Sequence, residues 1–141
     1  MKIMLDKGAK MPTRAHPWDA GLDLYAPEGD GVWGISPCGG SATIDTLVHV
    51  QIPEGCTGFI KAKSGLNVKH GLTCTGVIDA HYTGSIAVKL YNHHPCLRYD
   101  VRPGDKIAQL VIVPCLLPEL ELVDHLEETD RGDGGFGSTG R

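Results

Sequence analysis

Three features that would narrow the class of this protein are missing from its 141 residues: a long apolar run, an excess of basic residues, and paired cysteines. No apolar run approaches the roughly 20 residues that a membrane-spanning helix requires, so we expect no membrane segment. Residues 1–6 (MKIMLD) reach a charge too early for a secretion signal, which favours a cytoplasmic protein. The formal net charge of −4 argues against stable binding of nucleic acid through a basic face.

The five cysteines are an odd number and are widely spaced, at Cys38, Cys56, Cys74, Cys96 and Cys115. None belongs to a C-x-x-C pair, and most have apolar neighbours. This pattern argues against a disulfide framework or a zinc site and favours reduced thiols that pack in the interior.

Helical patterns are also scarce, because 19 glycines and 9 prolines interrupt the chain. Residues 46–53 and 85–91 alternate between apolar and polar side chains, as half-buried strands do. Residues 106–113 are nearly all apolar and predict a strand buried on both faces, and residues 114–126 are expected to form a further strand. Residues 28–43 are expected to form a loop. Short strands separated by turn residues predict an all-β sandwich or barrel.

The one plausible helix spans residues 64–71, with Ser64 as the N-cap and Gly71 as the left-handed residue after its end. The unpaired N–H groups of such a helix start, with Lys63 beside them, suit a phosphate group. An ordinary capped turn on the surface explains the same residues.

A hairpin is predicted over residues 76–84, with Asp79 at the end of an apolar approach and Tyr82 just after the bend. An aspartate in a turn usually accepts hydrogen bonds from its own backbone. It could also act as a desolvated general base. The ring of Tyr82 offers a flat surface for a sugar or a base.

Two polar side chains interrupt predicted strands. Asp23 alternates with Leu22 and Leu24, so we expect it on a solvated face. Gln109 has apolar neighbours on both sides, and a buried amide must find hydrogen-bond partners in the backbone or in a ligand.

The last eleven residues, 131–141, are rich in glycine and should be disordered alone. They also carry one aromatic ring, two hydroxyls and two arginines, which suit a ligand with a flat ring and anionic oxygens. We therefore expect two parts, a β-barrel domain over residues 1–126 and a flexible flap over residues 127–141.

Five separated blocks together resemble the trimeric dUTP pyrophosphatase (dUTPase) family. The blocks are residues 20–24 (AGLDL), 63–66 (KSGL), 76–84 (GVIDAHYTG), 102–110 (RPGDKIAQL) and 131–140 (RGDGGFGSTG). The resemblance implies a jelly-roll-like β-barrel with a flexible glycine-rich C-terminal arm. It also implies a homotrimer with active sites shared between subunits, and hydrolysis of dUTP to dUMP and pyrophosphate with Mg²⁺. That reaction keeps uracil out of DNA and supplies dUMP for thymidylate synthesis.

The resemblance also implies a role for each matching residue. Asp79 would be the catalytic base that activates water, and Tyr82 would pack under the deoxyribose. Asp23 would support the magnesium through water, while the triphosphate holds most of that ion. The backbone of residues 73–78 would read the uracil edge, through Thr73, Gly76, Val77 and Ile78.

The phosphate contacts implied by the resemblance come from three blocks. Those outside the tail are Lys63, Ser64, Gly65 and Gln109. From the tail, Phe136 would cover the uracil, and the phosphates would be sealed by Arg131, Gly137, Ser138 and Thr139.

Three positions depart from the family pattern. Lys63 stands where arginine is usual, His81 replaces an acidic residue, and Ser85 stands where glutamate is frequent. A lysine offers phosphate a point charge instead of a two-pronged contact, and protonated His81 is expected to weaken Asp79 as a base. Two alternatives stay open: a dCTP deaminase-like enzyme on the same fold, and a catalytically silent nucleotide-binding or regulatory protein.

Overall fold

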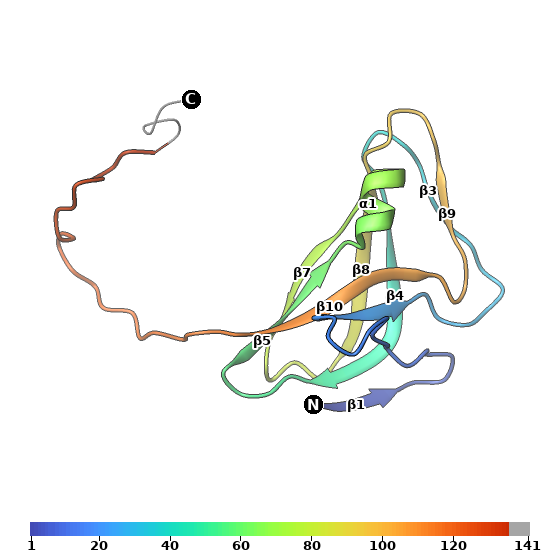
Figure 1. Cartoon of the computed structure of the whole chain (residues 1–141), viewed down its shortest axis with the longest axis horizontal. Helices are drawn as coiled ribbons and strands as arrows, with labels where there is room; N and C mark the ends of the chain where they lie inside the picture. The colour runs from blue at the N-terminus through green and yellow to red at the C-terminus, as the bar shows by residue number, and fades with distance from the viewer. Residues whose placement is uncertain (136–141) are drawn as a thin grey trace.

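The structure of the chain is a computed structural model, and it describes residues 1–135. These residues contain ten strands and one helix (Figure 1). The strands form two four-stranded sheets and one two-stranded sheet. All the strand pairs are antiparallel. The predicted all-β, jelly-roll-like fold is confirmed. No helix in this part of the chain is long and apolar enough to cross a membrane.

The first sheet has the strand order β1-β4-β8-β6. Its members are β1 (Lys2–Leu5), β4 (Gly40–Gln51), β8 (Ser85–Asn92) and β6 (Leu72–Thr73). The alternation read from the sequence holds here, because Val48 and Val50 of β4 and Ile86, Val88 and Leu90 of β8 are buried, while the positions between them are partly or fully exposed. One face of this sheet therefore contributes to the core.

The second sheet has the order β2-β10-β5-β7. Its members are β2 (Gly21–Tyr25), β10 (Lys106–Pro114), β5 (Cys56–Lys61) and β7 (Thr75–Ile78). The predicted burial of β10 on both faces holds only for its first half. Ile107, Ala108 and Leu110 are buried, whereas residues 111–113 are partly exposed.

Strands β3 (Trp33–Ile35) and β9 (Tyr99–Val101) form the third sheet. Buried side chains from all three sheets join in one hydrophobic cluster, which includes Leu24, Ile35, Ile44, Leu90 and Leu110. Each such side chain contributes about 1.5–3 kcal/mol by leaving water. This cluster fixes the relative positions of the strand ends that carry the polar residues described below.

Two sequence predictions of local structure are wrong. The expected loop over residues 28–43 contains β3 and the start of β4, because the short apolar patch at Trp33 and Ile35 finds a partner in β9. The expected strand over residues 114–126 is an irregular arm after Pro114. The arm leads away from the barrel (Figure 1), so its backbone has no neighbouring strand to pair with.

Strand β4 carries an irregularity that matters for the site. Its pairing register with β8 shifts between Asp45 and His49, and Leu47 has a φ of 59°. The buried Thr46 hydroxyl donates to the Ile86 carbonyl at 2.7 Å across the shift. A bulge of this kind redirects side chains locally, and here it precedes His49.

Candidate active site

Asp23 lies in the interior and not on a solvated face as the strand alternation predicted. Only 5% of it is exposed, since the chain after β5 brings Lys63 over it and β10 pairs beside it. Lys63 Nζ donates to Asp23 Oδ1, and Lys106 Nζ lies 2.8 Å from Oδ2. The lysine on Oδ2 is an ion-pair partner whose geometry is poor for a hydrogen bond, so Oδ2 keeps acceptor capacity.

The charge state of Asp23 is set by opposing effects. Burial disfavours the carboxylate and would by itself raise the pKa, but the close ammonium groups of Lys106 and Lys63 outweigh it. The net result is a pKa of Asp23 below its ordinary value. The side chain is therefore an anion held between two cations at neutral pH.

A pocket of about 360 Å³ opens beside this ion pair. It brings together three residues that the sequence analysis singled out, Asp23, Lys63 and Gln109. The Gln109 amide makes one long hydrogen bond, from Nε2 to the Ala62 carbonyl at 3.4 Å, so most of its hydrogen-bonding capacity remains for a ligand. A Cβ added at Gly21 would lie 2.1 Å from Gln109 Oε1, so the glycine makes room for this side chain.

Helix α1 (Ser64–His70) begins directly after Lys63. The predicted N-cap is wrong by one position: Lys63 is the cap with an extended ψ of 135°, and Ser64 is the first helical residue. Gly71 ends the helix in the left-handed conformation with φ of 66°, as predicted. Ser64 and Gly65 are exposed, and the first N–H groups of a helix have no partner within it.

Asp79 follows β7 at the opposite end of the second sheet. It is exposed, and its carboxylate accepts no hydrogen bond within residues 1–135. It lines a hollow of about 540 Å³ with Cys56, Thr57 and His81. The Asp79 carboxylate therefore does not accept hydrogen bonds from the backbone of its own turn. It is also not buried within a single chain, as a desolvated base would be.

Tyr82 stands in the same turn, with the Tyr82 N–H donating to the Asp79 carbonyl at 3.1 Å. Its hydroxyl donates to the Ser85 carbonyl at 2.9 Å, and 45% of the residue is exposed. The anchored hydroxyl holds the ring in one direction while leaving a face open for stacking.

The predicted hairpin over residues 76–84 is only partly formed. Strand β7 pairs with β5, and pairing with β8 is limited to Leu72 and Thr73 of β6. Within the described chain β7 is thus an edge strand. Such an edge offers a row of backbone donors and acceptors, here from Gly76 to Ile78.

One chain does not bring Asp79 and the Asp23 pocket together. The two lie at opposite ends of β5, since Gly58 pairs with Ile78 while Lys61 pairs with Gln109. Six residues of extended chain between Thr57 and Lys63 correspond to about 20 Å. The Asp79 carboxylate and the Lys63 ammonium of one chain are therefore too far apart to contact the same small group.

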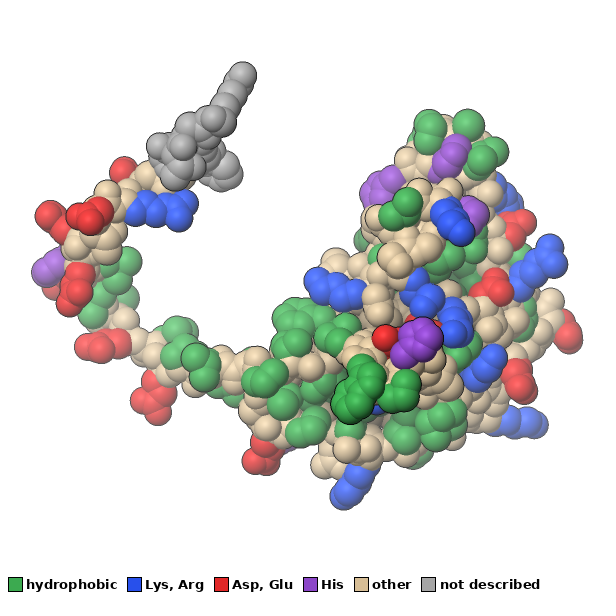
Figure 2. Space-filling model, viewed as in Figure 1, with side chains coloured by type: hydrophobic (Ala, Val, Ile, Leu, Met, Phe, Trp, Pro, Cys, Tyr) green, Lys and Arg blue, Asp and Glu red, His purple; other side chains and the backbone are tan. Residues whose placement is uncertain are grey.

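The arm over residues 115–135 leads away from the barrel and carries exposed leucines (Figure 2), of which Leu117 also lines the hollow beside Asp79. Between 83% and 100% of each is exposed, at Leu116, Leu117, Leu120, Leu122 and Leu126. Arg131 is exposed and donates only to the Gly134 carbonyl among the described residues, at 3.0 Å. The predicted contacts from Phe136, Gly137, Ser138 and Thr139 lie outside the described residues.

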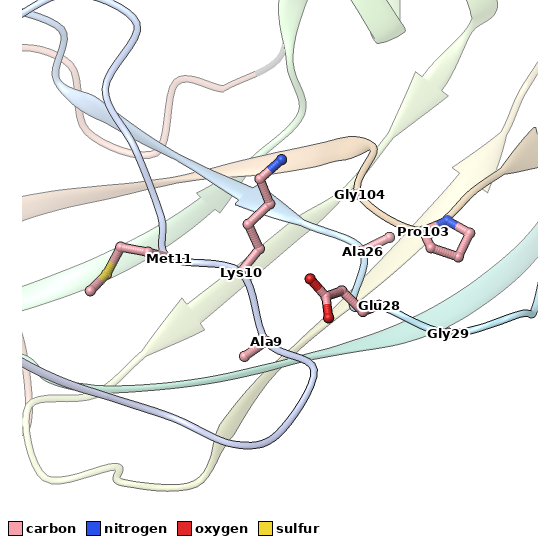
Figure 3. Close-up of a pocket in the computed structure, with 8 residues that line it drawn as sticks. All are labelled: Ala9, Lys10, Met11, Ala26, Glu28, Gly29, Pro103 and Gly104. Atoms are coloured by element: carbon pink, nitrogen blue, oxygen red, sulfur yellow. The ribbon is translucent and has the colours of Figure 1, made fainter.

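A larger hollow of about 570 Å³ contains none of the predicted site residues. Figure 3 shows its lining from three segments, which are residues 9–11, residues 26, 28 and 29, and residues 103–104. Its Lys10 ammonium lies 4.2 Å from the centre of the Tyr25 ring. With one lysine and one glutamate as its only charged groups, it has less of the chemistry that a triphosphate needs.

The roles of Lys106 and Gly21 are not predicted from the sequence. Lys106 was noted only as part of a block, because its contact with Asp23 depends on how β10 and β2 align. That pairing has a register shift between Lys106 and Ala108, which no local pattern reveals. The need for glycine at position 21 likewise depends on its cross-strand neighbour.

Comparison with known proteins gives a consistent result. A family model described as dUTPase matches residues 7–140. The deoxyuridine 5'-triphosphate nucleotidohydrolase of Arabidopsis thaliana is 44% identical over 96% of this chain and 80% of its own length. The enzyme of that name from Kluyveromyces lactis is 40% identical over 100% of this chain and 94% of its own.

Solved structures agree. The Staphylococcus bacteriophage 80alpha dUTPase with dUpNHpp is 35% identical and has a TM-score of 0.88 over 99% of this chain and 98% of its own. A mutant dUTPase from phage phi11 of S. aureus is 32% identical, with a TM-score of 0.79 over 90% of this chain and 98% of its own. That structure is described as revealing the coordination of a structural Mg(II) ion.

Proposed function

This chain belongs to the dUTPase family, and we propose that it is a dUTP diphosphatase that hydrolyses dUTP to dUMP and pyrophosphate. The observation that carries the proposal is the convergence of Asp23, Lys63 and Gln109 on one pocket from three separate parts of the chain. Charge neutralisation and positioning are what phosphoryl transfer mainly requires.

The triphosphate is expected to bind at this pocket and at the start of α1. Lys63 and the Gln109 amide would donate to phosphate oxygens, and the exposed backbone N–H groups of Ser64 and Gly65 would add two more donors. The Ser64 hydroxyl would lie near the leaving oxygen. The Lys63 ammonium offers charge without the two-pronged geometry of an arginine.

Asp79 is the proposed general base. Its carboxylate would take a proton from water as the water oxygen forms a bond to the α-phosphorus, and the bond to the bridging oxygen of the pyrophosphate breaks in line. Tyr82 would support the deoxyribose with its exposed ring face. The free edge of β7, with Thr73 before it, would hydrogen-bond the uracil edge.

Mg²⁺ fits the residues of the site. Residues 1–135 contain no group of three or more His, Cys, Asp or Glu side chains that could hold a metal ion by themselves, and Mg²⁺ commonly binds through substrate phosphates and water. Asp23 would then contact it through water, since the buried Oδ2 retains acceptor capacity. When bound, the ion would supply positive charge to the triphosphate.

We infer further that the working enzyme is a homotrimer with sites shared between subunits. The Asp79 turn and the Lys63 pocket of one chain lie about 20 Å apart along β5. A second copy must bring its Asp79 turn to the first copy's pocket for the two to act on one nucleotide. The leucines of the arm are exposed to solvent in the single chain, and contact with another subunit would bury their apolar surface.

Residues 127–141 are the proposed flap. Arg131 would reach the phosphates together with Gly137, Ser138 and Thr139, and Phe136 would cover the uracil. Closure of the flap would expel water and strengthen each polar contact inside.

One assay separates this proposal from its competitors. The protein is incubated with Mg²⁺ and dUTP, dCTP, dTTP or UTP in turn, and pyrophosphate and ammonia are measured. Pyrophosphate from dUTP alone is expected. Ammonia from dCTP would indicate the deaminase, and binding of dUTP without product would indicate a silent nucleotide-binding protein.

A further inference from the structure

The His49 ring contacts two parts of the chain: the turn that contains Tyr82, and the carboxylate of Asp6, which directly follows β1. Its ring Nδ1 lies 2.8 Å from the Thr83 carbonyl oxygen, and its Nε2 lies 3.0 Å from Asp6 Oδ2. Only 17% of the side chain is exposed. The ring thus connects the end of β1, the bulged strand β4 and the turn over residues 79–84.

Both of these contacts require the ring to donate. A carbonyl oxygen and a carboxylate are acceptors, and a neutral imidazole carries only one N–H. If Nδ1 carries the single proton, the lone pair on Nε2 faces the Asp6 carboxylate. Only the imidazolium, which carries a proton on each nitrogen, satisfies both partners.

We propose that protonated His49 is a positioning residue that holds the 79–84 turn, and with it Tyr82, in the geometry that binds nucleotide. Loss of its proton releases one of the two contacts and loosens the turn. The inference rests on the proposed function, because it assigns a regulatory role to the same substrate site.

The neighbouring contacts fasten the other side of this turn. Asp45 Oδ2 accepts a hydrogen bond from the Ser85 hydroxyl at 2.9 Å, and Asp45 Oδ1 accepts one from the Leu47 N–H at 2.9 Å. The Ser85 carbonyl in turn accepts the Tyr82 hydroxyl. Residues of β4 on both sides of the bulge therefore hold the turn at Thr83 and at Ser85.

The charged groups around the ring favour the protonated form. The hydrogen bond to Asp6 raises the pKa of His49 most, followed by the Thr83 carbonyl, with Asp45 adding negative charge and partial burial opposing. On β1, Lys2 lines a surface hollow together with His49 and is the cation on that side of the ring. β8 presents only the uncharged Ser85 opposite His49.

The direction of the pH effect follows from this. A raised pKa in the folded state means that the contact is fully present below the ordinary pKa of about 6.5 and is lost as the pH rises through the raised value. Binding of dUTP should therefore weaken with rising pH through the His49 titration.

Asp6→Asn is the deciding variant. An asparagine amide can donate to Nε2 of a neutral ring, while Nδ1–H still donates to Thr83, so both contacts survive without the extra proton. His49→Ala removes both contacts at every pH. Asp100→Asn, on β9 and outside this network, removes the same charge and serves as the matched control.

The experiment combines an NMR titration with steady-state kinetics. In the wild type and in Asp100→Asn, the amide resonances of residues 82–85 should titrate together with the His49 imidazole. The KM for dUTP should rise about fivefold across that titration, as for loss of one hydrogen bond, with kcat little changed. In Asp6→Asn the His49 pKa should fall, and KM should stay low and flat.

Two results would overturn the inference: amides of residues 82–85 that ignore the His49 titration, or a KM that rises equally in the wild type and in Asp6→Asn. The NMR arm needs no turnover. A chain that fails to hydrolyse dUTP but shows coupled titration would overturn the proposed function and leave His49 as the residue that positions the turn.

Discussion

The buried carboxylate of Asp23 holds two lysine side chains in place beside a pocket. It binds the ammonium groups of Lys63, which caps α1, and of Lys106, which begins β10, and it lines the pocket proposed for phosphate. Without its charge the two cations would face each other with no anion between them, which is unfavourable in a partly desolvated site. Its ionisation should therefore affect folding as well as binding.

Asp23→Asn should destabilise the protein most at neutral pH. A lowered pKa in the folded state contributes stability above the unfolded pKa of about 3.9, and this is lost as the pH falls through the folded value. The difference in unfolding free energy between wild type and variant should thus shrink below about pH 4. Urea denaturation from pH 3 to 7 measures it, and a difference that does not vary with pH would contradict this account.

Gly21→Ala should separate binding from stability. The added Cβ meets the flexible end of Gln109 at 2.1 Å, so the amide can swing away at little cost to the fold. We expect the KM for dUTP to rise about tenfold, as for loss of one good hydrogen bond to a charged group, with a small change in Tm. Gly31→Ala is the control, because a Cβ there meets nothing within 4 Å. A large fall in Tm with unchanged KM would show that Gln109 is structural.

At the scale of elements, Asn92 joins three segments at the end of β8. Its Nδ2 donates to the Ile35 carbonyl at 3.0 Å and to the Leu97 carbonyl at 2.8 Å, and its Oδ1 accepts the His94 N–H at 2.9 Å. The side chain is completely buried. Its amide therefore holds β3 and the loop after β8 together.

Asn92→Asp should lower the unfolding free energy by about 3 kcal/mol or more at pH 7, because a buried carboxylate would face two carbonyl oxygens with no proton to donate. Part of the lost unfolding free energy should be regained in acid, because a protonated carboxyl can donate one hydrogen bond to a carbonyl oxygen. Chemical denaturation at pH 7 and pH 4 tests this. The control is Asn67→Asp on the exposed face of α1, where Nδ2 makes one longer hydrogen bond to the Leu72 carbonyl at 3.3 Å. We expect this change to cost about 1 kcal/mol, and similar losses at both positions would count against the role of Asn92.

The elements differ in how well the sequence predicts them. Strands β4 and β8 and helix α1 follow from local alternation and from Gly71. Strand β3 and the irregular arm do not, because pairing with β9, or the lack of any partner, depends on distant residues. Likewise the alternation within β2 predicted a solvated Asp23, because the residues that cover it come from the start of α1 and from β10. The Asp79 turn and the glycine-rich tail stood out through composition and motif, and their roles stay predictions.

For the whole molecule, mixed trimers test the shared site. Asp79→Asn and Lys63→Gln should each be nearly inactive alone. If the base and the phosphate pocket come from different subunits, co-refolding equal amounts should restore about a quarter of the sites, because half the subunits keep each group. Pyrophosphate release measures the recovery, and light scattering must report the same trimer mass for every sample. No recovery in well-formed mixed trimers would place both groups in one chain.

Removal of residues 131–141 tests the flap. The barrel carries all the strand pairing of residues 1–135 before Cys115, so the truncated chain should keep the Tm of the full chain within a few degrees. Its kcat/KM for dUTP should fall about 100-fold, since closure contributes water exclusion and phosphate contacts. An Arg131→Gln variant of the full chain serves as the milder comparison. Full activity of the truncated chain would rule out the flap.

The pairing of Asp23 with two lysines has a further consequence for how nucleotide enters. Before any ligand arrives, these ammonium groups already have an internal counter-ion, so they attract few anions from solution. An incoming triphosphate then competes with Asp23 for the two ammonium groups, and few bound anions from the solution have to be displaced. Its affinity should consequently depend on ionic strength less steeply than the number of lysines at the pocket would suggest.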